Sequence, residues 1–275
     1  MSIQDCSFTR LAALAAALSA VAPAMAADPA GSGDWHYRAA IYAYMPSIDG
    51  TTSFPDSGGG SGITVSGDQL LDALEFAFMG NLEAHNGRWG VFTDVVYLNL
   101  GANKSGTRDF ALGSGPLDPS VSANLDYGLK GWSWTLAGEY RLVSDPALSL
   151  DLLAGARLFD IEQTLTWNVS GNLGTPPLVS ASGNATVNLE LWDAIVGVKG
   201  RYALGKDGKW SLPFYLDVGT GDSDLTVQAA AGVSRAFEWG EVSAVWRYLG
   251  YELDANKPVQ EVSFNGPQIG VAFVW

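Results

Sequence analysis

The sequence predicts an all-β fold, an antiparallel up-and-down transmembrane β-barrel, with ten strands favoured and eight or twelve left open. Three observations predict it. Strand-length segments alternate apolar and polar residues about ten times, glycine and tryptophan are abundant at 33 and 10 residues, and short turns alternate with long polar connections. Because successive side chains of a strand point to opposite faces, each segment has one apolar and one polar face.

The chain begins with the three-part layout of a secretory signal peptide. A weakly basic start is followed by the apolar run Leu11–Val21 and by small residues up to Ala26. A membrane anchor fits less well, because the run is short for a membrane span and is followed by Pro23. Residues 1–26 are therefore predicted to be a signal peptide and residues 27–275 the barrel domain.

Charge and cysteine content exclude several classes of function. The net charge is −14, and removal of Asp5 and Arg10 with the signal leaves it unchanged. Such a chain is not steered toward nucleic acid. The one cysteine, Cys6, lies inside the expected signal, so the mature chain has neither thiol catalysis nor a disulfide. No helical membrane span follows the signal, so an integral protein would have to be a closed barrel.

The first three strands are predicted near residues 35–45, 74–85 and 88–100. In each of them apolar and aromatic residues share one parity and polar or charged residues the other. A stretch rich in Gly, Ser and Asp, including residues 57–62, separates the first two strands and is predicted to be a long loop. Asn86-Gly87 predicts a two-residue hairpin between the second and third.

The fourth strand is predicted to follow a second long polar loop near residues 101–122, and it contains Trp132 and Trp134 on one parity. Ser144-Asp145-Pro146 predicts a short turn into the fifth strand, residues 148–158. A third loop, rich in Ser, Gly, Asn and Pro, is predicted near residues 167–185. It leads to the sixth strand, residues 191–202.

The last four strands are predicted near residues 210–218, 225–234 and 242–251 and from the loop at 255–258 to the chain end. Short turns or loops at residues 206–208, 219–224 and 238–240 separate them. Long connections mostly follow odd strands and short turns even ones, which is the asymmetry of bacterial outer-membrane barrels. An even strand number also places both termini on one side.

The two parities differ enough to predict which face meets lipid. A Lys or Arg facing lipid at mid-depth costs about 2–4 kcal/mol, so a dozen charges on that face would prevent insertion. The charged parity is therefore predicted to line the lumen as a network of six bases and six acids: Arg38, Glu83, Asp94, Glu139, Arg141, Asp151, Arg157, Asp193, Lys199, Arg201, Asp217 and Arg247. The apolar parity is predicted to carry an aromatic girdle: Trp35, Trp89, Trp192, Trp210, Trp246 and Trp275.

A soluble β-sandwich is the main alternative, because its two apolar faces pack on each other while charges meet water. Tryptophan near strand ends and a final strand that alternates up to the last residue favour the membrane barrel. Balanced lumen charges favour a filled interior, since buried charges must be paired. A narrow solute path through the lumen stays open as a second interpretation.

Candidate sites for chemistry are few. Asp217, Asp222 and Asp224 are weak candidates for a Ca²⁺ site, but their spacing matches no calcium-loop motif and is also ordinary turn chemistry, so no metal and no cofactor are predicted. Catalysis by a general base is not predicted either. The only histidines are His36 and His85, and neither lies in a predicted outer loop.

Several stretches resemble known barrels. The closing strand, with Ile269, Val271, Phe273 and Trp275 in alternation, resembles the signal that barrel-insertion machinery reads. Three further stretches, residues 192–197, 217–224 and 246–249, resemble a proteobacterial outer-membrane β-barrel family of largely unknown function, broadly similar to small barrels of the outer-membrane protein A type.

The resemblance implies a location in the cell outer membrane of a Gram-negative bacterium. Its implied partners are outer-membrane lipid, lipopolysaccharide and the insertion machinery, with the surface ligand left unknown, and it brings no catalytic residues. We expect a structural or surface-interaction protein rather than an enzyme, with a narrow diffusion channel as the alternative and an outer-membrane enzyme as a distant third.

Overall fold

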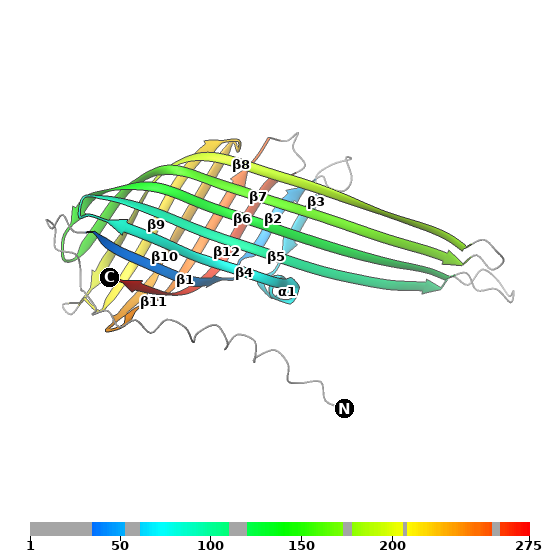
Figure 1. The fold of residues 1–275 in the computed structure, drawn as a ribbon, viewed down its shortest axis with the longest axis horizontal. Helices are drawn as coiled ribbons and strands as arrows, with labels where there is room; N and C mark the ends of the chain where they lie inside the picture. Colours follow the sequence, from blue (N-terminus) through cyan, green and yellow to red (C-terminus); the bar gives the residue numbers. More distant parts are fainter. Residues whose placement is uncertain (1–34, 53–60, 110–119, 173–177, 206–207, 255–258) are drawn as a thin grey trace, which may run out of the picture.

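The computed structural model describes residues 35–52, 61–109, 120–172, 178–205, 208–254 and 259–275. Twelve strands form one antiparallel sheet, and a single short helix joins two of them (Figure 1). The elements are β1 (His36–Tyr44), β2 (Ser47–Thr52), β3 (Ser61–Val65), α1 (Gly67–Ala73), β4 (Leu74–His85), β5 (Trp89–Asp109), β6 (Ser120–Ser144), β7 (Leu148–Asn172), β8 (Leu178–Leu204), β9 (Trp210–Gly221), β10 (Leu225–Phe237), β11 (Gly240–Glu252) and β12 (Val259–Val274).

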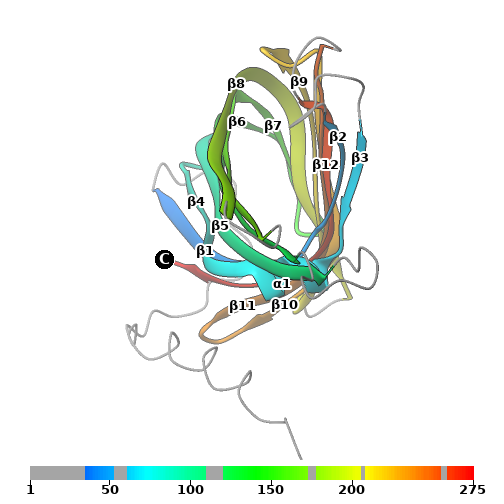
Figure 2. The ribbon, with the colours of Figure 1, turned by 90° about the vertical axis from the view of Figure 1, so that its right-hand side faces the viewer.

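Ten of these strands, β1 and β4 to β12, close into a barrel. Each pairs with its neighbour, and β1 completes the ring by pairing with both β4 and β12. At the seam the ring of Tyr37 stacks on that of Trp275 with centroids 6.0 Å apart. Figure 2 shows the strands curving around one interior. The all-β fold class and the strand count of ten are therefore confirmed.

The two ends of the barrel differ. At one end, here the turn end, four tight connections join the strands, and the chain closes at Trp275. The Asn86-Gly87 hairpin is one of them: Gly87 has a positive φ of 87° and Asn86 N–H donates to the carbonyl of Trp89 at 2.9 Å. At the opposite end, here the hairpin end, β5 to β8 run far beyond the other strands (Figure 1).

The segment between β1 and β4, predicted to be a long loop, is partly folded. β2 pairs with the outer half of β12 where β1 has ended, and β3 pairs with β2. The helix α1 starts at a capping box in which the Ser66 side chain accepts from Gln69 N–H and the Gln69 side chain accepts from Ser66 N–H. The loop prediction was therefore wrong for β2, β3 and α1, whose sequences lack the apolar alternation by which the other strands were predicted. Residues 53–60 of the predicted loop lie outside the described residues.

Two further loop predictions, at residues 101–122 and 167–185, are wrong for the described residues, while residues 110–119 and 173–177 lie outside them. β5 continues to Asp109, β6 begins at Ser120, β7 continues to Asn172 and β8 begins at Leu178. The pairing is continuous along these hairpins. Their sequences resemble loops because Ser, Asn, Thr and Gly replace the apolar residues on one parity.

The polarity of the sheet inverts along these long strands. In β8 the outward side chains Trp192 and Val196 are apolar and exposed, while the inward Asp193 is buried. Above this level the outward residues Asn188 and Glu190 are polar and exposed, and the inward ones are apolar. β7 inverts at the paired position, where the outward Leu158 is followed by Asp160, and β6 inverts where the outward Lys130 precedes Trp132. The inversion therefore lies at a similar level on these three neighbouring strands.

A glycine in the barrel wall allows two strands to approach closely. A Cβ built on Gly155 would lie 2.0 Å from the Leu136 carbonyl oxygen and 2.5 Å from Ala137 Cα, whereas a Cβ on Gly128 would meet nothing within 4 Å. Both glycines lie in long paired strands.

Gly155→Ala should therefore lower the free energy of unfolding by about 1–3 kcal/mol through overpacking. Gly128→Ala, the matched control, should change it by less than about 0.5 kcal/mol. Urea titration in detergent micelles, followed by tryptophan fluorescence, measures both. Equal effects of the two substitutions would show that the close approach at Gly155 does not constrain the wall.

Candidate functional site: the charged lumen and its closure

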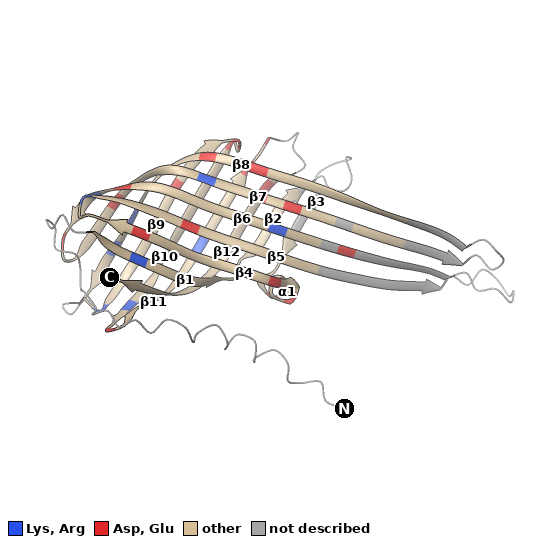
Figure 3. Ribbon diagram, in the orientation of Figure 1, with Lys and Arg blue, Asp and Glu red and all other residues tan. Residues whose placement is uncertain are grey.

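The structure places the twelve charges of the predicted lumen network on the inward face of the barrel. Seven of them are buried: Asp94, Glu139, Asp151, Arg157, Asp193, Asp217 and Arg247. Figure 3 shows acidic and basic residues interspersed along the barrel rather than separated by sign. Nine of the ten barrel strands, all except β12, contribute at least one inward charge or buried polar side chain among the described residues, and the pairs described below link strands that are not neighbours.

The layer nearest the turn end is organised by Glu241, a residue that the sequence analysis did not single out. Its carboxylate accepts from Arg38 Nη2 at 3.3 Å and lies 2.7 Å from Arg201 Nη2. Arg38 also donates to Asn81 Oδ1 at 3.2 Å. The sequence did indicate an inward position for Glu241, because Glu241 shares the parity of Ser243 and Arg247. The sequence analysis missed this residue because it directly follows the predicted turn at residues 238–240.

The next layer holds an amine between two carboxylates. Lys199 Nζ lies 2.8 Å from Glu83 Oε2 and 2.5 Å from Glu139 Oε1. Beside it Arg141 makes two bonds to Asp151, from Nε at 2.7 Å and from Nη2 at 3.0 Å. His85, which is 3% exposed, has its Nε2 3.5 Å from Asp151 Oδ1. One lysine therefore joins β4, β6 and β8.

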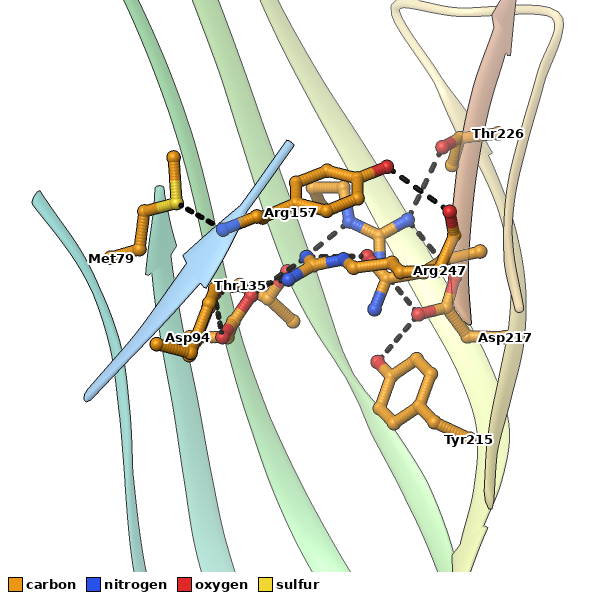
Figure 4. Close-up of polar contacts among 11 residues, drawn as sticks. Met79, Asp94, Thr135, Arg157, Tyr215, Asp217, Thr226 and Arg247 are labelled. Atoms are coloured by element: carbon orange, nitrogen blue, oxygen red, sulfur yellow. Dashed lines mark hydrogen bonds and ion pairs between the residues drawn. The ribbon is translucent and has the colours of Figure 1, made fainter. Parts of the chain in front are cut away.

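At mid-height the guanidinium of Arg157 is fully buried and each of its three nitrogens donates to at least one acceptor (Figure 4). Its two terminal nitrogens bind the two oxygens of Asp217, with Nη1 at 3.0 Å, as a fork. Nε donates to Thr135 Oγ1 at 3.1 Å and Nη1 also donates to Thr226 Oγ1 at 3.3 Å. Bidentate, charge-assisted pairs of this kind are among the strongest polar contacts in proteins.

Arg247 forms a second cluster at the same height. It donates to Asp94 Oδ2 at 2.8 Å, to Tyr42 Oη at 3.0 Å and to Gln228 Oε1 at 3.0 Å. The Tyr42 hydroxyl in turn donates to Asp94 Oδ1 at 2.6 Å. The two arginine clusters together cross the lumen from β1 and β5 to β9, β10 and β11.

Above the arginines, toward the hairpin end, the interior is apolar, which the sequence analysis did not predict. Two clusters of buried side chains fill it: Phe159, Ile161, Leu191, Leu249, Tyr251, Leu253 and Val262 in one, and Tyr42, Tyr44, Met79, Val96 and Leu98 in the other. The rings of Phe159 and Tyr251 stack with centroids 4.3 Å apart. The unbroken apolar run at residues 95–98 was the available signal, because both faces of that strand had to be buried.

Below the arginines, toward the turn end, the lumen holds a cavity of about 930 Å³. Its lining reaches from the turn residues Asp145 and Trp239 up to Tyr42, Tyr215 and Arg247. Apart from Tyr42, its described lining contains no member of the two apolar clusters. Among the described residues this part of the lumen is therefore a vestibule, lined by both charged and apolar side chains, that ends blindly at the arginine clusters.

The three aspartates weighed for Ca²⁺ are not brought together. Asp217 points into the lumen, where it binds Arg157 and accepts from Tyr215 Oη at 2.5 Å. Asp222 accepts from the Trp192 backbone N–H at 2.9 Å, and Asp224 is exposed. Within the described residues no three His, Cys, Asp or Glu side chains are placed to hold a metal ion.

Asp193 differs from the other inward charges because its partner is a hydroxyl and a backbone amide. It accepts from Ser223 N–H at 2.9 Å and from Ser223 Oγ at 2.7 Å. The carboxylate therefore fastens the connection between β9 and β10 to β8.

The predicted girdle tryptophans all point outward and are 44–61% exposed. Trp35, Trp89, Trp210 and Trp275 lie near the turn end, and Trp192 and Trp246 lie near the polarity inversion. Trp132, which is 45% exposed, joins the second group. Two aromatic levels thus bracket an apolar outer surface.

No protein-family model matches the chain, and no curated protein matches it. Solved barrels of similar shape include the outer membrane protease OmpT of Escherichia coli, at 10% identity and a TM-score of 0.46, with 88% of this chain and 97% of that one covered. The translocator domain of the autotransporter NalP of Neisseria meningitidis shows 15% identity and a TM-score of 0.35, with 88% of each covered.

Ail, the attachment invasion locus protein of Yersinia pestis, shows 13% identity and a TM-score of 0.30, with 88% of this chain and 100% of that one covered. None of these likenesses identifies an activity or a ligand for this chain. No helix among the described residues is long and apolar enough to cross a membrane.

Removing both partners of the Arg157–Asp217 pair should be less damaging than the two single removals added together. Arg157→Met leaves the Asp217 carboxylate buried without its cation and should cost about 3–5 kcal/mol of unfolding free energy. In the double variant with Asp217→Asn the loss should be clearly smaller than the sum of the single losses. Urea unfolding of the four proteins in micelles measures the coupling, and strict additivity would mean that the pair does not act as a unit.

Proposed function

We propose that this chain is an integral outer-membrane β-barrel of a Gram-negative bacterium with a structural or surface-interaction role. Its ten strands form a closed wall, its lumen is sealed at mid-height, and its two long hairpins, β5–β6 and β7–β8, project outside the cell. The observation that carries this proposal is the seal made by the Arg157 and Arg247 clusters with the apolar clusters above them.

A membrane location is supported by the outer surface between the two tryptophan levels. Large apolar side chains are exposed there on most strands, including Ile41, Phe78, Leu82, Leu136, Leu152, Val196, Leu216 and Ile269. A soluble protein rarely exposes a contiguous apolar surface of that kind. Lipid and lipopolysaccharide would cover it, and the insertion machinery would engage the final strand.

The orientation follows from the connections. Outer-membrane barrels place short turns in the periplasm and long connections outside. The turn end, with the vestibule mouth, would then face the periplasm, and the polarity inversion near Trp192 would mark the outer surface of the membrane. Above that level the outward Asn188 and Glu190 would meet water rather than acyl chains.

A diffusion channel is the second candidate, and the vestibule of about 930 Å³ is the observation that favours it. A solute entering from the periplasm would still meet the arginine clusters and then the apolar clusters, which close the described lumen. Catalysis is less well supported, because His85 is buried against Asp151 on the periplasmic side rather than placed near an outer rim.

The purified barrel should therefore show no steady conductance in planar lipid bilayers. Arg157→Ala should lower stability without opening a path for sugars in liposome swelling, because the ring stack of Phe159 and Tyr251 lies above the vacated site. The double variant Arg157→Ala with Asp217→Ala is the control, because it removes more side-chain volume than Arg157→Ala but leaves no unpaired carboxylate. Large steady currents from the unchanged chain would contradict the sealed lumen.

Cysteine labelling tests the sidedness of the vestibule. The chain has no cysteine after Cys6, so each introduced thiol is unique in the mature protein. Ser243→Cys, in the vestibule wall, should react with a membrane-impermeant maleimide only from the turn end. Asn188→Cys, on the projecting part of β8, should react only from the opposite side. Labelling of Ser243→Cys from both sides of an oriented vesicle would show a continuous path.

A further inference from the structure

We propose that the projecting edge of β8, residues 180–190, is a docking site for an extended strand of a separate protein, which adds to the sheet by main-chain hydrogen bonds. This inference rests on the proposed function, which places that edge outside the cell. It names the element of the surface that would make the interaction and the kind of partner that fits it.

Above the barrel rim β8 has a neighbour on one side only. β7 pairs with it along its whole length, from Leu148↔Tyr202 to Asn172↔Leu178. On the other side β9 pairs with it only up to Asp193↔Gly221. Among the described residues, the part of β8 beyond Trp192 therefore presents an unpaired sheet edge.

The contacts of Trp192 show which residues form that edge. Its carbonyl accepts from Asp222 N–H at 3.0 Å, and its own N–H donates to Asp222 Oδ2 at 2.9 Å, so both backbone groups point away from β7. In an antiparallel strand the same direction recurs at every second residue. The N–H and C=O groups of Ser182, Asn184, Thr186, Asn188 and Glu190 accordingly point to the open side, and all five residues are exposed.

This edge lacks the usual protection against strand addition. Natural edges are blunted by Lys, Pro, bulges or short length. Between Leu178 and Trp192 β8 contains no Pro, Lys or Arg, its pairing with β7 has no bulge, and Glu190 is its one charge. The other long edge of the projection, in β5 from Gly101 to Asp109, contains Lys104, Arg108 and Asp109, and the edge strand β3 is only five residues long.

The free backbone groups of an unpaired edge indicate which kind of ligand can bind there. Alternating N–H and C=O groups along one line are complemented by the backbone of an extended polypeptide, as in β-strand addition. The inward side chains Ala185, Val187 and Leu189 are half-buried, whereas the outward ones are polar. A fitting strand would therefore carry apolar residues at every second position, so that its apolar side continues the inner face of the sheet.

A second copy of this chain fits less well than a separate partner. Two copies in one membrane have the same orientation relative to the membrane plane, so their β8 strands both run in the same direction across it. With a strand tilt of about 40°, two-fold-related copies would have β8 strands that cross at about 80° instead of aligning. A separate extended segment has no such constraint.

The test uses the full mature chain folded in detergent micelles and a labelled synthetic peptide that copies residues 159–171, an alternating strand known to pair with β8 along its other side. The unchanged barrel should bind the peptide saturably. Thr186→Pro with Asn188→Pro removes two edge donors while leaving the β7 pairing in place, and should weaken binding at least about tenfold. Thr186→Ala with Asn188→Ala, the matched control, keeps both donors and should bind within about twofold of the unchanged chain.

Binding that survives the proline pair, or no binding at all by the folded unchanged barrel, would overturn the assignment. A doubling of mass in sedimentation that the proline pair abolishes would identify a second copy as the occupant and overturn the choice of a separate partner. Conductance measured on the same preparations keeps the two proposals apart. A barrel that shows no conductance and binds no peptide contradicts only the docking site on β8. A barrel that conducts contradicts the sealed lumen of the proposed function.

Discussion

Burial of charge inside a closed ring is the constraint on which the rest of this structure depends. A guanidinium with no access to water is tolerated only if its nitrogens find acceptors, and each nitrogen of Arg157 donates to Asp217, Thr135 or Thr226. Those partners lie on β6, β9 and β10, so satisfying one side chain fixes the relative height of four strands. The terminal nitrogens of Arg247 likewise link β11 to β1, β5 and β10, while its buried Nε has no hydrogen-bond partner among the described residues.

Closure of the barrel and pairing of the inward charges depend on each other. The seam between β1 and β12 removes the sheet edge that would otherwise lie exposed, and it also converts the charged parity into an interior. Once the charges are inside, their near balance of sign allows them to neutralise one another instead of requiring counterions. The same arrangement leaves the apolar parity outside, between two levels of tryptophan, and in the proposed function a lipid bilayer would cover that surface.

The side chains that fill the lumen change in kind from the turn end to the hairpin end, and this change is consistent with the proposed role. Ion pairs with partial exposure line the vestibule at the turn end, fully buried pairs occupy mid-height, and apolar rings fill the space above. A barrel built only to conduct would keep a hydrated path, whereas the described interior becomes more apolar toward the hairpin end. The projecting sheet then continues the apolar inner face upward, while its outward face becomes polar where lipid would end.

The sequence by itself determined the fold class and the parity on which each charge lies, because a period of two along a strand assigns every residue to one face, and it favoured ten strands over eight or twelve. Near the turn end, where strands are flanked by Asn-Gly or Asp-Pro turns, the predicted positions of strands such as β4 needed little change. The tertiary structure alone decided which charges pair, since Arg157 and Asp217 are sixty positions apart and meet only when the ring closes.

The tertiary structure also decided that Glu241 belongs to the lumen, that the outer half is sealed by Phe159 and Tyr251, and that the Ser/Asn/Thr-rich stretches of β5 to β8 are paired strands. Local sequence could not show this, because polar residues form a strand there only when a neighbouring strand supplies hydrogen bonds along the whole length.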